Sequence, residues 1–270
     1  MSRKGRQRER EGRPSPNGYS RARKGEEPLM SSEQLVTEGR RARLAGVAGT
    51  LAVVSIIASL TAARSLVEGA AIDLEGGADV LEGLRQFQGS RETVAAVYGF
   101  QSLAYLLLIP FGLFLWSACR ARRPEVSRWL ARASVLIPAL AALSGVVAFL
   151  ALSGVVAAFL AATDQTEATA LALTSESGLL RISSAAAETA PWVVGVWVAW
   201  LAYELMRTGL TTRSVAVFGI AAAVVPIIAP AVGTGVLIGW AGSVAIILFG
   251  YWPGGRPPAW EAGRPLPPDV

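Results

Sequence analysis

The sequence has no histidine and only one cysteine, Cys119. Without histidine, one chain cannot build the zinc site of a metalloprotease, a serine–histidine dyad or a bis-histidine haem. A single cysteine excludes an intramolecular disulfide and a thiolate metal cluster. The G-x-x-x-x-G-K-[ST] loop that cradles nucleotide phosphates is absent as well. We therefore expect a protein that is not an enzyme, with no catalytic residues, no cofactor and no metal site.

Charged residues are also scarce, at 17% of the 270 residues, whereas 52% are hydrophobic. The hydrophobic residues form runs of roughly 18 to 25 residues, the length that an α-helix needs to cross about 30 Å of hydrocarbon. Cores of soluble proteins do not need such runs. The sequence predicts an all-α fold, a polytopic transmembrane helical bundle of about six helices with disordered N- and C-terminal tails.

Composition divides the chain into three parts. Residues 1–40 are polar and rich in arginine, which predicts a disordered basic cytoplasmic tail. Residues 41–252 form the predicted six-helix transmembrane domain, and residues 253–270 a second, Pro/Gly-rich cytoplasmic tail that is extended and solvated. The six predicted spans are about 44–63, 93–118, 133–162, 185–206, 215–229 and 235–252.

The last two spans come from one long apolar block, residues 215–252. The block is too long for one crossing, and Pro226, Pro230 and Gly233 lie near its middle, so we expect two helices joined by a tight turn. A further short helix is expected over residues 78–87, because its apolar residues recur every three or four positions. This helix should lie on the membrane or cap the bundle.

Arginines indicate the orientation of the spans, because basic residues favour cytoplasmic loops. In a six-span arrangement one side holds most of the arginines near the spans, and the other side holds mainly Asp and Glu. The arginines on the first side are Arg40, Arg41, Arg43, Arg120, Arg122, Arg123, Arg128, Arg132, Arg207, Arg213, Arg256 and Arg264. Both termini are therefore predicted to be cytoplasmic.

Polar side chains occur inside two of the predicted spans. Tyr98, Gln101 and Tyr105 are three and four residues apart and share one helical face. They could line a cavity for a polar solute, or they could hydrogen-bond to neighbouring helices as structural contacts, which is the interpretation that we favour. Glu188 could carry protons or bind a cation, but a solvated glutamate at the membrane surface is the more ordinary interpretation.

Small residues repeat every four positions in Gly235, Gly239 and Ser243, and again around Gly46. Such faces let helices approach closely, so these residues are predicted to pack against other helices. The basic N-terminal tail is expected to contact the lipid bilayer, in particular anionic lipid headgroups. Its interspersed glutamates, and the presence of Tyr19 as its single aromatic residue, argue against nucleic acid as a partner.

The segment from Tyr203 to Arg213 resembles the junction between the fourth and fifth helices in a widespread family of uncharacterised six-pass bacterial membrane proteins. Four residues match that pattern, namely Arg207, Thr208, Gly209 and Arg213, whereas Thr212 stands where the family has proline. The ending at residues 251–260 resembles tails of actinobacterial membrane proteins. The resemblance implies a multi-pass protein of the bacterial plasma membrane, and it implies no activity.

Two functions fit the sequence. The first is a non-enzymatic membrane-organising protein or a subunit of a membrane complex, with other membrane subunits as possible partners. The alternative is a small-solute transporter, or the substrate-binding membrane subunit of one, in which Tyr98, Gln101, Tyr105 and Glu188 line the site. The alternative requires a polar cavity that reaches the middle of the membrane.

Overall fold

The computed structural model describes residues 30–69 and 80–266. These residues fold into helices and contain no strand, so the predicted all-α class is confirmed. The helices are α1 (Ser32–Gly69), α2 (Val80–Gly89), α3 (Arg91–Arg122), α4 (Arg128–Ala161), α5 (Glu167–Glu176), α6 (Gly178–Thr208), α7 (Arg213–Ala221), α8 (Val225–Ile228), α9 (Pro230–Phe249) and α10 (Ala259–Ala262).

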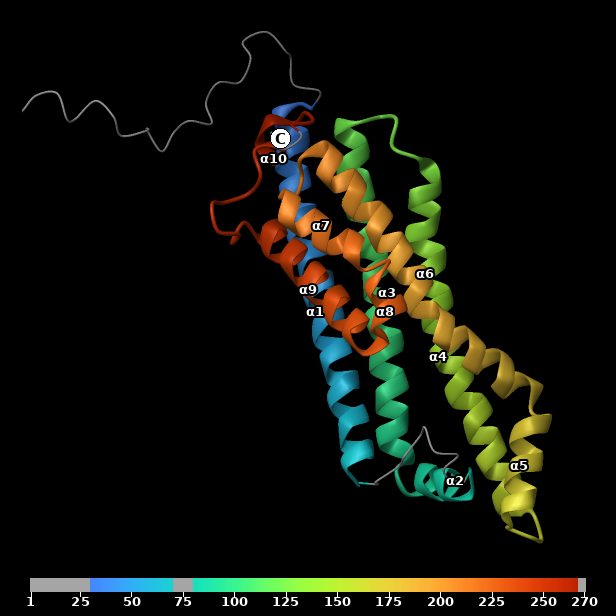
Figure 1. The fold of residues 1–270 in the computed structure, drawn as a ribbon. Coiled ribbons are helices and arrows are strands. Elements are labelled where there is room, and N and C mark those ends of the chain that lie inside the picture. The colour runs from blue at the N-terminus through green and yellow to red at the C-terminus, as the bar shows by residue number, and fades with distance from the viewer. Residues whose placement is uncertain (1–29, 70–79, 267–270) are drawn as a thin grey trace, which may run out of the picture.

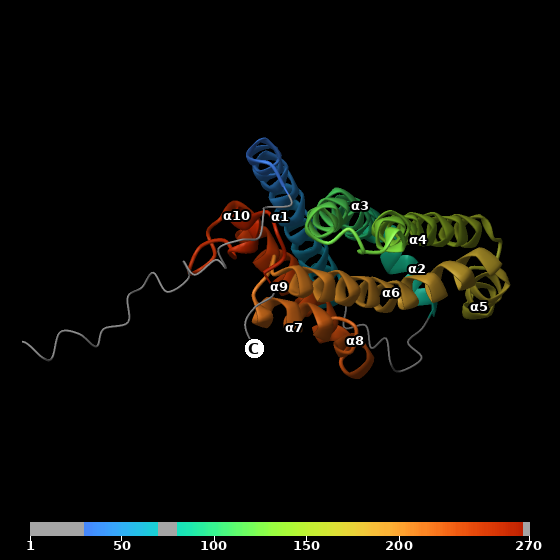
Figure 2. The same cartoon turned by 90° about the horizontal axis from the view of Figure 1, so that it is seen from above.

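Five of these helices, α1, α3, α4, α6 and α9, are long and apolar enough to cross a membrane. They form a polytopic transmembrane bundle in which α3 packs between α1 and α4, α6 packs on α4, and α9 packs on α1. Figures 1 and 2 show α4 and α6 leading away from the group formed by α1, α7 and α9.

The bundle core combines large aromatic residues with leucine and alanine. Phe111, Trp197 and Trp240 are almost fully buried, and Phe111 packs edge-on against Trp240. The indole N–H of Trp197 donates a hydrogen bond to the Ser134 hydroxyl at 3.1 Å, which ties α6 to α4. This bond satisfies a buried donor for which lipid supplies no partner.

Both described ends of the chain lie at one end of the bundle (Figure 1), which we call the terminal end. At the opposite end, α2 packs Leu84 and Phe87 against Val155 and Phe159 of α4. This end is called the α2 end below. The short amphipathic helix predicted for residues 78–87 is therefore confirmed as a cap on the bundle, although residues 78 and 79 lie outside the described part.

The predicted spans of the last apolar block differ from the structure. The stretch predicted as one span over 215–229 consists of α7 and the four-residue α8, and together they are shorter than the five long helices. Pro226 explains the break, because it has no N–H to donate to the carbonyl of Ala222 four residues earlier. The chain then turns at Ala229 and returns as α9.

The first helix begins at Ser32, well before the span predicted from residue 44 and inside the predicted tail of residues 1–40. A capping box explains this start. The Gln34 N–H donates to the Ser31 hydroxyl at 3.3 Å, and the Ser31 N–H donates to the Gln34 side-chain oxygen at 2.9 Å. Residues 1–29 lie outside the described part.

The prediction of an extended, solvated tail over residues 253–270 is wrong for the residues that the structure describes. Trp260 of α10 is buried, and its indole N–H donates to the Leu210 carbonyl at 2.9 Å. The Leu266 N–H donates to the Thr208 carbonyl at 3.3 Å. Gly254 and Gly263 have positive φ angles of 92° and 60°, which let the chain turn back onto the bundle.

Candidate membrane-embedded site

The break between α7 and α8 lies against a close approach of α6. A Cβ atom added at Gly195 would lie 2.2 Å from the carbonyl oxygen of Ala222, so only glycine fits there without movement of the backbone. Pro226 leaves that carbonyl without its usual helical donor. Glycine and proline therefore shape one wall of a cavity.

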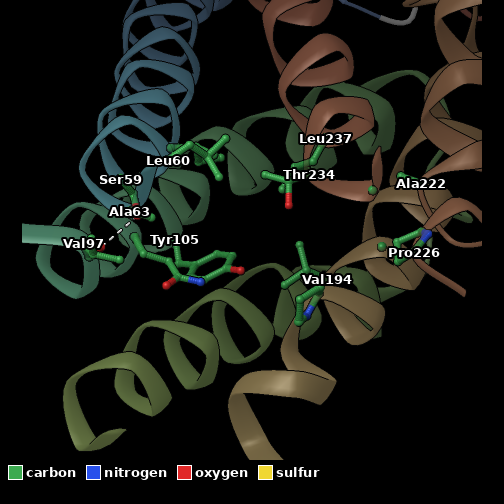
Figure 3. A pocket seen from close by; sticks show the side chains of 15 residues that line it. Ser59, Leu60, Ala63, Val97, Tyr105, Val194, Ala222, Pro226, Thr234 and Leu237 are labelled. Carbon is green, nitrogen blue, oxygen red and sulfur yellow. Dashed lines mark hydrogen bonds between the residues drawn. The ribbon is translucent and has the colours of Figure 1, made fainter. Parts of the chain in front are cut away.

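The cavity has a volume of about 240 Å³ and lies between α1, α3, α6, α8 and α9. Its polar groups come from Ser59, Gln101, Tyr105 and Thr234, and most of the remaining wall is apolar. Figure 3 shows Tyr105 of α3 and Thr234 of α9 pointing into the same space from different sides. We call this space the central cavity.

The central cavity offers hydrogen-bonding groups that are only partly used. The Ser59 hydroxyl donates to the Val97 carbonyl at 2.9 Å, which joins α1 to α3. The Gln101 side chain lies near the Tyr105 hydroxyl of the same helix. An amide has two donor hydrogens and an acceptor oxygen, so Gln101 keeps capacity for a further partner.

No charged side chain is found among the described residues that line the central cavity. Full charges in a low-dielectric site need a counter-charge or several aligned dipoles. The lining is therefore suited to an uncharged ligand with a hydrogen-bonding group and an apolar body.

Gln101 and Tyr105 place the cavity well inside the membrane-spanning section. They lie about 15 and 21 Å from the start of α3 at Arg91, at 1.5 Å per residue. The helix is about 48 Å long over its 32 residues. The two residues are thus about one third and somewhat under one half of the way along the helix.

The central cavity also borders the outer surface of the bundle. Leu60 lines the cavity and is 49% exposed, and Val54 and Ile57 on the same stretch of α1 are exposed to a similar extent. Apolar side chains exposed along a membrane-spanning helix face lipid. A ligand that dissolves in the bilayer could therefore reach the cavity from the side.

The structure separates the residues that the sequence grouped together. Gln101 and Tyr105 line the cavity, but Tyr98 packs its ring on Phe149, with 6.2 Å between ring centroids. Residues three apart differ by about 60° around a helix, so Tyr98 faces α4 instead. Glu188 is exposed and does not line the cavity, which corrects its predicted place in the site.

The predicted packing glycines also differ from one another. Cβ atoms added at Gly46 and Gly239 would lie 3.1 Å from the Phe249 ring and 2.6 Å from the Phe218 ring, so both residues lie at close helix contacts. Gly235 is exposed, and a Cβ atom added there would have no neighbouring atom within 4 Å, so it is not a packing residue in this chain. Ser243 is half-buried on α9.

Sequence reasoning missed a cluster at the terminal end. Arg122 is fully buried and forms a bidentate ion pair with Glu38, with N–O distances of 2.7 and 3.0 Å. Arg122 also donates to the Ala259 carbonyl at 2.8 Å, and its guanidinium lies 5.1 Å from the Trp260 ring centroid. The apolar Trp260 within a polar tail was the only sequence signal of this cluster.

Comparison with protein-family models, with curated protein sequences and with solved structures finds no match to this chain. A functional assignment therefore depends on the geometry of the two ends and of the central cavity.

Proposed function

We propose that this chain is a non-enzymatic membrane protein that binds a small, uncharged amphiphile in the central cavity, as a carrier or as the substrate-binding membrane subunit of one. The observation that supports this most directly is the cavity beside Gln101 and Tyr105. Structural hydrogen bonding would instead give Gln101 a partner on another helix. Within the described residues the Gln101 side chain makes no hydrogen bond to another helix, and it lies near the Tyr105 hydroxyl of its own helix.

The chemistry of the lining supports a small ligand of this class. At about 240 Å³ the cavity lies below the range of about 300 to 1,000 Å³ that is common for drug-sized ligands. Its hydroxyl and amide groups suit one hydrogen-bonding head, and Leu60, Val194 and Leu237 suit an apolar body. The exposed side of Leu60 suits entry from the bilayer.

A second function, a subunit of a membrane complex, is favoured by the surfaces of α4 and α6. Only 33% of the most apolar stretch of each is buried within the chain, compared with 56% for α3. These two helices also lead away from the rest of the bundle (Figure 2). They leave apolar surface that lipid or another membrane subunit would cover.

The proposed setting is the plasma membrane of a bacterium, with the terminal end in the cytoplasm. The arginine distribution supports this orientation, and the positions of both described ends at one end of the bundle agree with an even number of crossings. The basic N-terminal tail would contact anionic lipid headgroups on that side.

Two matched tyrosine variants test the binding proposal. The full-length protein in mild detergent is titrated with medium-chain alcohols, amides and phenols, and the thermal unfolding midpoint is recorded. We expect at least one compound to raise the midpoint of the native protein. Tyr105→Phe should weaken the binding of that compound by up to about tenfold, the effect of losing one hydrogen bond.

Tyr98→Phe is the control, because Tyr98 lies on the same helix and faces Phe149 rather than the cavity. It should leave the affinity unchanged. A panel in which no compound shifts the midpoint, or equal effects of the two variants, would contradict binding in the central cavity.

A further inference from the structure

A second cavity lies at the terminal end, between the start of α1 and the end of α3. Its volume is about 510 Å³, within the usual range for ligand sites. We call it the terminal cavity. It shares no lining residue with the central cavity.

The two walls of the terminal cavity differ in character. The α1 wall carries Glu33, Thr37, Glu38 and Arg41, whereas the α3 wall is mainly apolar, with Phe114 and Ala118. Phe114 stacks on Trp260, with ring centroids 6.1 Å apart and an angle of 7° between the planes. The apolar wall is thus held in place by the buried C-terminal helix.

The charges of the terminal cavity are only partly paired. Glu38 is neutralised by Arg122 at 2.7 Å. Glu33 and Arg41 have no ion pair with any described residue, and both are exposed. One negative and one positive group therefore remain free to contact a ligand.

These two groups are ordered along the axis of α1. The apolar run of α1 begins at Leu44, so Arg41 stands one helical turn outside it, at the level of lipid phosphates. Glu33 is eight residues, or about 12 Å, further from the hydrocarbon. Residues 33, 37 and 41 follow one another at four-residue spacing and so lie along the same side of the helix.

We propose that the terminal cavity binds a zwitterionic phospholipid whose headgroup carries a phosphate and a primary amine. Arg41 contacts the phosphate, Glu33 contacts the ammonium group, and Phe114 with Ala118 contact the glycerol and the first acyl carbons. The order of charges on α1 matches the order in such a lipid, in which the phosphate lies nearer the acyl chains than the amine does.

The free carboxylate of Glu33 distinguishes this lipid from an anionic one. Arginines alone attract anionic lipids without regard to the rest of the headgroup. A carboxylate beside the same site repels a headgroup that is only negative and attracts one that carries an ammonium. The site should therefore prefer phosphatidylethanolamine to phosphatidylglycerol.

The experiment measures lipid binding to the purified full-length protein by native mass spectrometry, with phosphatidylethanolamine and phosphatidylglycerol of identical acyl chains. We expect the native protein to bind phosphatidylethanolamine about fivefold more tightly. Glu33→Gln should remove this preference. Arg41→Ala should weaken the binding of both lipids by about fivefold, equivalent to about 1 kcal/mol.

Arg43→Ala is the matched control, since Arg43 is exposed on the same helix and does not line the cavity. It should keep the preference between the two lipids. Equal effects of Arg41→Ala and Arg43→Ala, a preference for phosphatidylglycerol, or no retained lipid would each overturn the proposal.

A competition experiment with a water-soluble compound tests whether the ligand is a lipid or a free headgroup. Glycerophosphoethanolamine has the same phosphate and amine but no acyl chains. We expect it to compete with the lipid poorly, because the apolar wall has nothing to contact. If glycerophosphoethanolamine displaced the lipid at equal concentration, the proposal that the ligand is a lipid would be overturned.

Discussion

Arg122 and Glu38 form a bidentate ion pair that joins the end of α3 to the start of α1, with N–O distances of 2.7 and 3.0 Å. The Arg122 side chain is fully buried and that of Glu38 is 10% exposed. Because Arg122 also donates to the Ala259 carbonyl, the same guanidinium holds the C-terminal segment on the bundle. One side chain thus links three segments that are far apart in the sequence.

Removing one partner of this pair should destabilise the protein strongly. Arg122→Met leaves the Glu38 carboxylate without its counter-charge and the Ala259 carbonyl without its donor. We expect the free energy of unfolding to fall by about 3 kcal/mol, the lower end for a broken buried pair because Glu38 keeps some contact with solvent. Thermal unfolding in detergent measures the effect.

The double variant Arg122→Met with Glu38→Leu tests the cause. It removes the orphaned carboxylate and should recover part of the lost stability. Arg128→Ala is the control, because Arg128 is an exposed arginine with no ion pair to a described residue, and it should change little. A double variant less stable than Arg122→Met would contradict this account.

Trp260→Ala should release the C-terminal segment. The substitution removes the indole hydrogen bond to Leu210, the stacking on Phe114 and the contact with the Arg122 guanidinium. Large-to-small changes of this kind lower stability by about 3 to 5 kcal/mol. Trp129→Ala makes the same change at a side chain that is 66% exposed, so it should have a much smaller effect.

The buried C-terminal segment also shows where sequence reasoning stops. Long apolar runs predict membrane-spanning helices because only helices satisfy their backbone in lipid, so the bundle could be predicted. Proline and glycine at residues 253–258 predict irregular backbone, and that is correct locally. Whether irregular backbone lies in solvent or packs on the bundle depends on contacts with Phe114 and Leu210, which no local pattern reveals.

The central cavity was predictable only in part, for a similar reason. The cost of an unpaired amide in hydrocarbon predicts that Gln101 faces the bundle interior rather than lipid, and its place in the cavity lining confirms this. Ser59 and Thr234 were missed, because single hydroxyls in apolar helices can bond to their own backbone and give no signal. Tyr98 was wrongly predicted to line the cavity, because the polar face of α3 borders both α4 and the cavity.

Gly195→Ala should disturb the wall of the central cavity. The added methyl group would meet the Ala222 carbonyl oxygen at 2.2 Å, and a backbone oxygen cannot rotate away as a side chain can. Overpacking of this kind typically lowers stability by about 1 to 3 kcal/mol. The measurement is the unfolding midpoint without and with a cavity ligand.

Gly154→Ala provides the comparison, since a Cβ atom there would have no neighbour within 4 Å. Alanine favours a helix more than glycine does, so this variant should be as stable as the native protein or more stable. Equal losses in the two variants would show that the contact with Ala222 is not the cause.

Ser102 and Gln101 are neighbours with different expected roles. The Ser102 hydroxyl donates to the Ala142 carbonyl on α4 at 3.0 Å, whereas Gln101 lines the cavity. Ser102→Ala should lower the free energy of unfolding by about 0.6 to 2 kcal/mol, the contribution of one interhelical hydrogen bond in a membrane. Gln101→Leu should change stability less, because it breaks no such bond. A larger loss for Gln101→Leu would support a structural role instead.

The last prediction concerns the side of the membrane on which the ends of the chain lie. A reporter that is active only in the cytoplasm should be active both when fused after Val270 and when placed before Ser31. The structure supports a shared side, because the hydrogen bonds from Arg122 to Glu38 and to Ala259 require α1, α3 and the C-terminal segment to meet at one end of the bundle. The same reporter inserted at Ser177, between α5 and α6 at the α2 end, is the control and should be inactive. Activity at only one of the two termini would mean an odd number of crossings. In that case α7, α8 and α9 could not enter and return as a pair, and the contacts of Arg122 with both ends could not form within one molecule.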